Sequence, residues 1–459
     1  MDSTGYAGRA TAPAAQRLTR AAQRVVAESH VATLLIVLAA FANTLLWARA
    51  LPFDGGSDER LHLETVEFIA RHGRLPVLGV DLFGRSISPY RAEITHAAEP
   101  PLPYLVAAAA MRLLSPWVDA LPAARLASAL SIAATVWLAL RMGRLWFPDS
   151  PALQRCTGLF VAAIPQVTHV GSYVNSDAFT LFAASLALYL ASRGVLDGWG
   201  ARMPAALGGA LGLALLSRLN GYAVVPAAAL LVLLAQASSW RVRVQRLALT
   251  RAVAVLVSGW WFIWNLWVYN GDLFAARLTD QTWRQLASLW RSLADTGMPF
   301  VAMAGYLYFW ARLFSSFWAV FGYSNVPLHP ALYFLPMVLT LALVASSVWS
   351  IAHLGHAVLR RQALAPRVWL PAIYAGLLGS LVLATMWWCW KVDFQPLGRY
   401  LFPALLPSTI LVFEGMRRAL PQRHTVTVVL CVLGLMLLNW ICLAGYVPRV
   451  RPGFFDVDL

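Results

Sequence analysis

Apolar stretches of about 20 residues recur along nearly the whole chain, and they limit its fold more than any other feature. About 20 apolar residues let a helix cross the hydrocarbon core of a bilayer. Composition agrees, because 59% of the 459 residues are hydrophobic and only 12% are charged, against about 25% charged in soluble domains. The sequence predicts an all-α polytopic membrane protein with about 11 (9–13) transmembrane helices. The stretches lie near 31–49, 122–141, 156–174, 177–193, 204–218, 221–237, 250–268, 331–352, 369–389, 400–416 and 426–446.

The basic residues predict how these helices are oriented. The net charge of +15 comes from arginine clusters between apolar stretches, not from an extended stripe of arginine and aromatic residues that would suit nucleic acid. With the N-terminus inside, each inner loop carries arginine and few acids, which satisfies the positive-inside rule. We therefore expect a cytoplasmic N-terminal segment (1–30), a transmembrane domain (31–446) and an outer C-terminal tail (447–459), with large outer loops over 50–121 and 269–330.

Under this orientation the unusual polar residues collect at the outer ends of the helices. The first outer loop contains Ser57, expected to cap a helix that runs from Asp58 to His72 and stops at Gly73. Asp58 and His62 are four residues apart, so they share a face. Asp58 and Glu59 are candidate catalytic acids; the alternative is that both merely complement the helix dipole.

The same loop ends in a second polar group. His96, Glu99 and Tyr104 flank the paired prolines 100–101, which fix the start of a helix and leave Glu99 just outside it. Glu99 could instead be a solvated acid before a proline stop. Asp58, His62, His96 and Glu99 could together form an open site for a divalent metal ion.

Later outer turns add acids, amides and arginines. Asn175 and Asp177 lie in a tight turn between two apolar stretches, where Asp177 could be functional or could cap the next helix. Arg218 at the next outer turn could pair with Asp177 or bind an anionic headgroup.

A final polar segment follows an aromatic run at 387–390. It contains Lys391, Gln395, Arg399 and Tyr400, and its two cations could hold a phosphate group. The alternative is that both cations extend to lipid headgroups.

Several chemistries lack their motifs. The sequence contains no P-loop, no HExxH, no GxSxG and no GxGxxG in a strand–helix setting. Nucleotide hydrolysis, zincin-type proteolysis and Rossmann cofactors therefore lose support.

The order of these polar motifs resembles the GT-C superfamily of membrane glycosyltransferases, and it is similar to bacterial relatives of protein O-mannosyltransferases and aminoarabinose transferases. The resemblance covers roughly residues 30–420. Its motifs are 57–62 (Ser-Asp-Glu-Arg-Leu-His), 71–76 (Arg-His-Gly-Arg-Leu-Pro), 99–104 (Glu-Pro-Pro-Leu-Pro-Tyr), 175–178 (Asn-Ser-Asp-Ala), 217–221 (Ser-Arg-Leu-Asn-Gly), 259–265 (Gly-Trp-Trp-Phe-Ile-Trp-Asn), 317–322 (Phe-Trp-Ala-Val-Phe-Gly) and 395–404 (Gln-Pro-Leu-Gly-Arg-Tyr-Leu-Phe-Pro-Ala).

The resemblance implies an enzyme of the bacterial inner membrane that moves a sugar from a polyprenyl-phosphate donor to a lipid, glycan or protein acceptor outside the cytoplasm. It implies Asp58 as base, with Glu59 adjacent, Asp177 as the second acid, and Arg399 as the phosphate ligand with help from Arg218 and Lys391. A single displacement at the anomeric carbon would invert configuration. The remaining candidate substrate-binding residues are His62, His96, Glu99, Tyr104, Asn175, Gln395 and Tyr400.

Glu99 departs from the pattern, because aminoarabinose transferases place a lysine immediately before the paired prolines. The phosphate contact of that lysine cannot be transferred to this chain. The chain also lacks the larger soluble C-terminal domain of several relatives, so the outer loops would have to recognise the acceptor.

Two other classes of function remain open from the sequence. A transporter or flippase of a lipid-linked saccharide could use the same outer cavity without forming a bond. A non-catalytic envelope assembly protein could use the acidic loop 50–121 as a docking surface.

Overall fold

The computed structural model describes residues 12–78, 80–81, 96–235, 239–277, 292–361 and 365–453, with side chains from His30 onward. Parts of the predicted loops 50–121 and 269–330, and of the segments 1–30 and 447–459, lie outside these ranges. The division of the chain at these boundaries stays a prediction.

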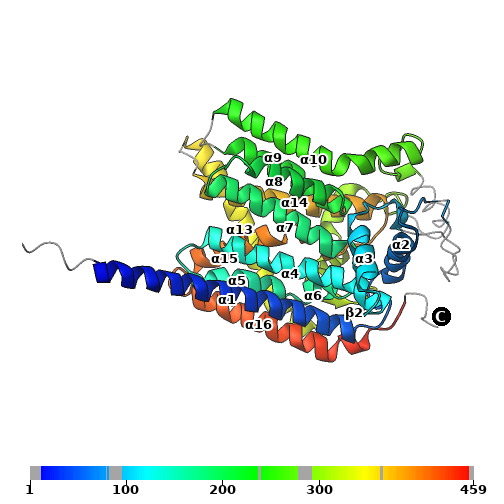
Figure 1. Ribbon diagram of the computed structural model, residues 1–459, viewed down its shortest axis with the longest axis horizontal. Coiled ribbons are helices and arrows are strands. Elements are labelled where there is room, and N and C mark those ends of the chain that lie inside the picture. Colours follow the sequence, from blue (N-terminus) through cyan, green and yellow to red (C-terminus); the bar gives the residue numbers. More distant parts are fainter. Residues whose placement is uncertain are drawn as a thin grey trace, which may run out of the picture.

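Long helices lie roughly alongside one another and form the body of the protein (Figure 1). Their apolar sequences explain why they form, since a helix satisfies every backbone group within itself and can face lipid. These helices are α1 (Ala12–Ala50), α4 (Ala120–Trp146), α7 (Asp177–Leu196), α10 (Trp240–Val268), α13 (Phe334–Leu359), α14 (Pro366–Lys391) and α16 (His424–Gly445).

Shorter helices and one two-stranded antiparallel ribbon complete the described residues. The α-helices are α2 (Glu59–His72), α3 (Leu102–Leu114), α5 (Pro151–Ala163), α6 (Pro165–Gly171), α8 (Met203–Leu215), α9 (Val224–Leu234), α12 (Leu307–Trp318) and α15 (Leu405–Ala419). The ribbon pairs β1 (Val320–Phe321) with β2 (Val326–Pro327). The 3₁₀ turns are η1 (His96–Ala98), η2 (Leu219–Ala223), η3 (Phe300–Gly305), η4 (Pro330–Tyr333), η5 (Gly398–Ala404) and η6 (Val447–Arg449).

Within the described residues each predicted apolar stretch coincides largely with helical structure, and the all-α polytopic class is confirmed. Seven helices within the described residues are long and apolar enough to cross a membrane by themselves. The helices at 203–215 and 219–234 are shorter, so the predicted number of about 11 spans stays a prediction.

Pro165 divides the predicted stretch 156–174 into two helices. α5 ends at Ala163, and Ile164 has an extended backbone (φ −68°, ψ 117°) before α6 begins at Pro165. A proline has no amide hydrogen and disfavours helical backbone in the residue before it. The break turns α6 toward the ribbon, where the side-chain oxygen of Gln166 accepts a hydrogen bond from the Val320 amide at 2.9 Å.

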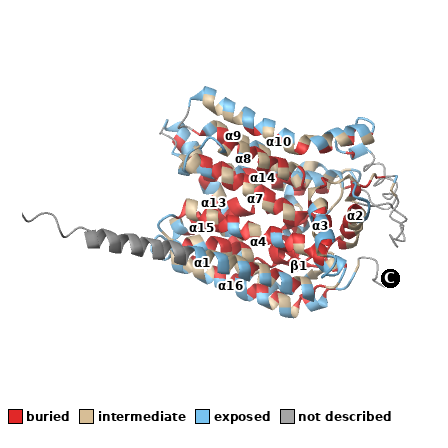
Figure 2. Cartoon of the chain, in the orientation of Figure 1, coloured by how far each residue is buried: buried red, intermediate tan, exposed pale blue. Residues whose placement is uncertain are grey.

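Burial divides the long helices into inner and outer ones. α4 and α7 are buried on most of their surface, whereas α1, α10, α13 and α16 expose large apolar side chains (Figure 2). In water such a surface would promote association, but in a bilayer it meets lipid chains.

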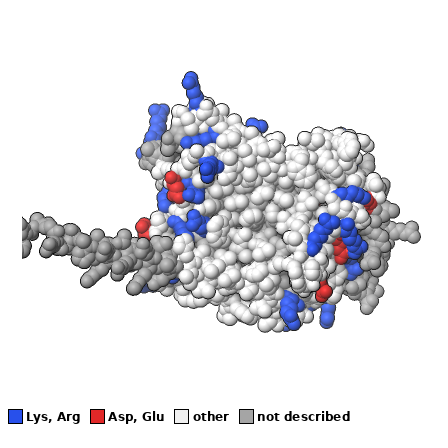
Figure 3. All heavy atoms as spheres, in the orientation of Figure 1, with Lys and Arg blue, Asp and Glu red and all other residues white. Residues whose placement is uncertain are grey.

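Charged side chains on the visible face concentrate toward the two ends of the bundle and leave an uncharged band between them (Figure 3). One end carries α2, α3 and the ribbon, and α1, α10 and α16 each end there (Figure 1). This arrangement is typical of a protein that spans a bilayer. α12, at about 18 Å, is too short to span it and matches an interfacial helix.

The capping role predicted for Ser57 is wrong. α2 begins at Glu59, and Asp58 precedes it in a left-handed conformation without a side-chain cap. The Ser57 hydroxyl instead donates to the carbonyl oxygen of Gly322 at 3.3 Å, so a contact with the ribbon replaces the local cap. The predicted stop is confirmed: Gly73 has φ 69°, and its amide bonds to the carbonyl of Ile69.

Candidate active site

Most of the predicted polar residues meet at the end of the bundle that carries α2 and α3. Five segments contribute: the turn before α2, the η1–α3 connection, the turn 172–176 before α7, the turn 216–218 after α8, and the start of η5. The site is built from helix ends because polar backbone and side chains can leave the apolar layer there.

Asp58 has an unusual backbone and an open carboxylate. Its φ of 62° and ψ of 18° are left-handed, a conformation that aspartate tolerates better than most residues. The side chain is half-buried, and within the described part of the chain its carboxylate makes no hydrogen bond or ion pair. This backbone turn leaves the Asp58 side chain open, while the side chain of the next residue, Glu59, lies buried in the protein.

Glu59 is fully buried, and each of its two carboxylate oxygens accepts two hydrogen bonds. Its carboxylate accepts two hydrogen bonds of 2.7 Å from Arg125 on α4, and one each from the amides of Asp54 and Val174. Arg125 also donates to the carbonyl oxygens of Ala48, Leu51 and Pro52. The pair therefore joins the end of α1, the first loop, α4 and the turn before α7.

His62, His96, Glu99 and Tyr104 form one hydrogen-bonded group. The Tyr104 hydroxyl donates to Glu99 Oε2 at 2.7 Å and lies 2.9 Å from His62 Nδ1. Because the hydroxyl proton points at the carboxylate, His62 Nδ1 must be the donor to the Tyr104 oxygen. His96 Nδ1 lies 3.0 Å from Glu99 Oε1, and the Ser176 hydroxyl donates to Glu99 Oε2 at 3.3 Å.

Burial and neighbouring charges separate the pKa values of the two histidines. Burial, with the neighbouring His96, holds the pKa of His62 well below its ordinary value. Burial also opposes charge on His96, but the charge of Glu99 and its hydrogen bond outweigh that effect and raise the pKa of His96. Burial would raise the pKa of Glu99, yet the charge and hydrogen bond of His96, together with Arg218, hold it well below the usual range. The group thus favours a charged His96–Glu99 pair beside a neutral His62.

His62, His96 and Glu99 lie close enough to suggest a metal site, since one ligand atom from each falls within 4.8 Å of the others. The two imidazole rings, however, stack face to face, with centroids 3.8 Å apart and planes within 8°. Imidazole ligands direct in-plane lone pairs at an ion about 2 Å away, and two stacked rings cannot both do so. The donor set does not fit an ion bound by both histidines, and the predicted metal stays a prediction.

Asp177 holds two arginines beside this group. Its carboxylate oxygens lie 2.8 Å from Arg218 Nη1 and 3.2 Å from Arg399 Nε. Arg399 also donates from Nη1 to the Tyr173 hydroxyl at 2.9 Å, and Arg218 lies over the ring of Tyr400. One carboxylate between two guanidinium groups leaves a net positive charge, which suits an anion.

The structure also shows which predicted residues stand apart. The Asn175 side chain bonds to backbone: it donates to the carbonyl oxygens of Val170 and Tyr173 and accepts from the Ala178 amide. Asn175 therefore performs the capping considered for Asp177. Lys391 and Gln395 are exposed, and Lys391 lies 5.9 Å from the centre of the Trp390 ring.

Sequence reasoning missed Arg125, Tyr173 and Ser176. Arg125 had a signal, since a charged residue inside an apolar stretch needs a partner. Tyr173 and Ser176 had none beyond their place in the turn.

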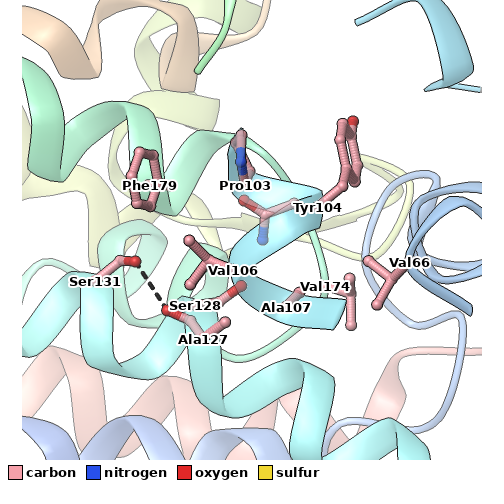
Figure 4. A pocket seen from close by; sticks show the side chains of 11 residues that line it. Val66, Pro103, Tyr104, Val106, Ala107, Ala127, Ser128, Ser131, Val174 and Phe179 are labelled. Atoms are coloured by element: carbon pink, nitrogen blue, oxygen red, sulfur yellow. Dashed lines mark hydrogen bonds between the residues drawn. The ribbon is translucent and has the colours of Figure 1, made fainter. Parts of the chain in front are cut away.

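Two small hollows border the site. The first lies between α2, α3, α4 and the turn before α7, with Val66, Tyr104, Val106 and Phe179 in its lining (Figure 4). The second is more polar and is lined by Ser57, His169, Ser316 and Arg399. The first offers apolar contact and the second hydrogen bonds.

The comparisons with known proteins agree with this geometry. Residues 98–264 match the family model of dolichyl-phosphate-mannose-protein mannosyltransferases. No curated protein is detectably similar to the chain in sequence.

Two solved structures share the fold. The crystal structure of ArnT from Cupriavidus metallidurans bound to undecaprenyl phosphate aligns with a TM-score of 0.51 and 16% identity, over 91% of this chain and 78% of ArnT. The oligosaccharyltransferase AglB from Archaeoglobus fulgidus, in complex with an inhibitory peptide and a dolichol-phosphate, aligns with a TM-score of 0.52 and 14% identity. That alignment covers 92% of this chain but only 56% of AglB.

A further structure of the Archaeoglobus fulgidus oligosaccharyltransferase, in complex with Zn and sulfate, aligns with a TM-score of 0.52 and 16% identity, over 92% of this chain and 54% of that one. The resemblance noted from the motifs is thus confirmed at the level of the fold. The chain is a polytopic membrane protein with the GT-C glycosyltransferase fold.

Proposed function

We propose that the protein transfers a sugar from a polyprenyl-phosphate donor to a lipid, glycan or protein acceptor at the extracytoplasmic face of a bacterial inner membrane. The observation that carries the proposal is that a free carboxylate and two guanidinium groups occur in one site. The open carboxylate of Asp58 lies in the same site as the buried Arg399 and the half-buried Arg218, which share a single acid, Asp177. Glycosyl transfer needs a base for the acceptor and positive charge for the departing phosphate.

The reaction follows from these roles. An acceptor hydroxyl gives its proton to the Asp58 carboxylate while its oxygen forms a bond to the anomeric carbon. The bond from that carbon to the phosphate oxygen breaks, and its electron pair leaves with the lipid phosphate beside Arg399 and Arg218. One displacement inverts the anomeric configuration.

Glu59 has a different role in this proposal from its neighbour. Its oxygens are filled by Arg125 and two backbone amides, so it holds the first loop in place and does not take part in proton transfer. The left-handed backbone of Asp58 separates the two acids, one directed into the protein and the other left open.

The relatives support the donor class. ArnT was solved with undecaprenyl phosphate and AglB with a dolichol-phosphate, and the matching family model is named for a dolichyl-phosphate-mannose donor. No step is assigned to a metal ion.

The test is mass spectrometry of lipid-linked sugars and envelope glycans in a strain that lacks the gene. We expect a polyprenyl-phosphate sugar to accumulate and one glycan residue to be lost. Asp58→Asn should fail to restore that residue although the protein inserts at the wild-type level, and Asp119→Asn, an exposed acid of the same loop, should restore it. Full restoration by Asp58→Asn would reject the base, and an unchanged glycan profile would reject the function.

A further inference from the structure

His96 is held by one ring nitrogen and open at the other. Its Nδ1 bonds to Glu99, whose second oxygen is fixed by Tyr104 and Ser176, and one face of its ring is covered by His62. Its Nε2 is buried and has no hydrogen-bond partner among the residues that the structure describes. A buried ring nitrogen is normally paired, so this atom is available to a group that none of the described residues supplies.

The charges around His96 indicate the kind of group. Three carboxylates (Asp58, Glu99 and Asp177) and two guanidinium groups (Arg218 and Arg399) face the site. With His96 neutral, these groups sum to one negative charge, and an incoming phosphodiester would add another. A protonated His96 brings the empty site to neutrality, and its Nε2–H becomes a charged donor for a phosphate oxygen.

We propose that His96, braced by Glu99, is a third cationic ligand of the donor phosphate beside Arg218 and Arg399, and that it binds the phosphate in its protonated form. The proposal rests on the proposed function and adds to it a phosphate-binding residue and a coupling between donor binding and one proton.

His62 does not act as a cationic ligand of the phosphate. It stacks on His96 and donates from Nδ1 to Tyr104, and two stacked imidazoles in a buried site do not both carry charge. The groups that set the proton on His96 are therefore Glu99, Asp58 and Arg218, with neutral His62 and Tyr104 beside them. Among these groups Glu99 raises the pKa of His96 most. Its role as the partner of a protonated His96 explains why an acid lies at the rim of a site for an anion.

The experiment uses farnesyl methyl phosphate, a diester with one constant negative charge, and the full-length protein in lipid nanodiscs. Affinity is measured between pH 5 and pH 9 by isothermal titration calorimetry. Binding to the wild-type protein should weaken about tenfold as pH rises through the pKa of His96. Repeating the titration in buffers of different ionisation enthalpy measures proton uptake. Near the midpoint of the pH dependence, binding should take up a fraction of one proton, and this second measurement needs no variant.

The variants sharpen the assignment. His96→Asn should bind as weakly at low pH as the wild type does at pH 9, with no pH dependence, whereas His72→Asn, an exposed histidine at the end of α2, should behave as wild type. Glu99→Gln should move the midpoint to lower pH, because the carboxylate that favours the imidazolium is gone. Binding that is independent of pH and without proton uptake would overturn the role of His96 while the proposed donor stands. Failure to bind the diester at any pH would overturn the donor class and, with it, this inference.

Discussion

The carboxylate of Glu59 and the guanidinium of Arg125 form a two-pronged ion pair, with both bonds 2.7 Å long, that is almost completely buried. Five further hydrogen bonds tie the pair to backbone at the end of α1, in the first loop and before α7. Because the pair joins these segments directly beside the turn that carries Asp58, it holds the neighbouring Asp58 in position.

Removing one member of this pair should destabilise the protein strongly. Glu59→Gln or Arg125→Met leaves a buried group uncompensated, at a cost of about 3–5 kcal/mol. Thermal unfolding in detergent measures the loss. The matched control is Glu67→Gln, which breaks the exposed Glu67–Arg71 pair and should cost less than about 1 kcal/mol. Equal effects at the two sites would show that Glu59 has no such structural role.

Arg399 should affect donor binding more than folding. Arg399→Gln removes a charge from the pair of guanidiniums on Asp177, and Arg399→Lys keeps the charge but loses the contact geometry with Tyr173 and Asp177. We expect the glutamine variant to weaken binding of farnesyl methyl phosphate by about 10-fold or more, with the lysine variant in between. The exposed Lys391→Gln serves as control. A loss at Lys391 that matches or exceeds the loss at Arg399 would move the phosphate away from Asp177.

The apolar sequence predicted where the helices lie, because the length and spacing of apolar runs follow directly from the thickness of a bilayer. Without the family resemblance, the residues themselves could not decide between Asp58 and Glu59, two adjacent acids of similar chemistry. The different surroundings of the two acids depend on Arg125, which lies far along the chain, and on the left-handed backbone of Asp58, which no local sequence pattern predicts. The cap predicted for Ser57 failed for the same reason, since a contact with Gly322 outweighs a local rule.

The histidine group shows the same limit in another form. The motifs placed His62, His96, Glu99 and Tyr104 on one side of the membrane, which made either a metal site or a substrate site reasonable. Only the stacking of the two rings distinguishes these possibilities, and stacking depends on how α2 packs against η1 and α3.

Gly398 should not tolerate a side chain. A Cβ added there would overlap the Phe317 amide nitrogen, a backbone atom of α12 that cannot move aside easily. Gly398→Ala should therefore displace η5, which carries Arg399, lowering the free energy of unfolding by about 3 kcal/mol or more and weakening binding of the diester. Gly379→Ala in α14 is the control, since nothing lies within 4 Å of its added Cβ and alanine favours a helix by up to about 1 kcal/mol. Wild-type stability and binding in Gly398→Ala would contradict the close packing of η5 against α12.

Asn439 should contribute to stability without contributing to catalysis. Its side-chain oxygen accepts from Asn43 and from the Trp47 indole on α1, and its amide donates to Thr168 on α6, so one residue joins three helices in an apolar layer. Asn439→Leu strands the Trp47 and Asn43 donors, and we expect a loss of about 1–3 kcal/mol in unfolding free energy. Sugar transfer per folded molecule should stay unchanged, because none of these contacts involves Asp58, Asp177 or Arg399. Trp440→Leu, at the exposed neighbouring position, should change the unfolding temperature little. An unfolding temperature as high in Asn439→Leu as in Trp440→Leu would show that the polar contacts do not hold α1 and α16 together.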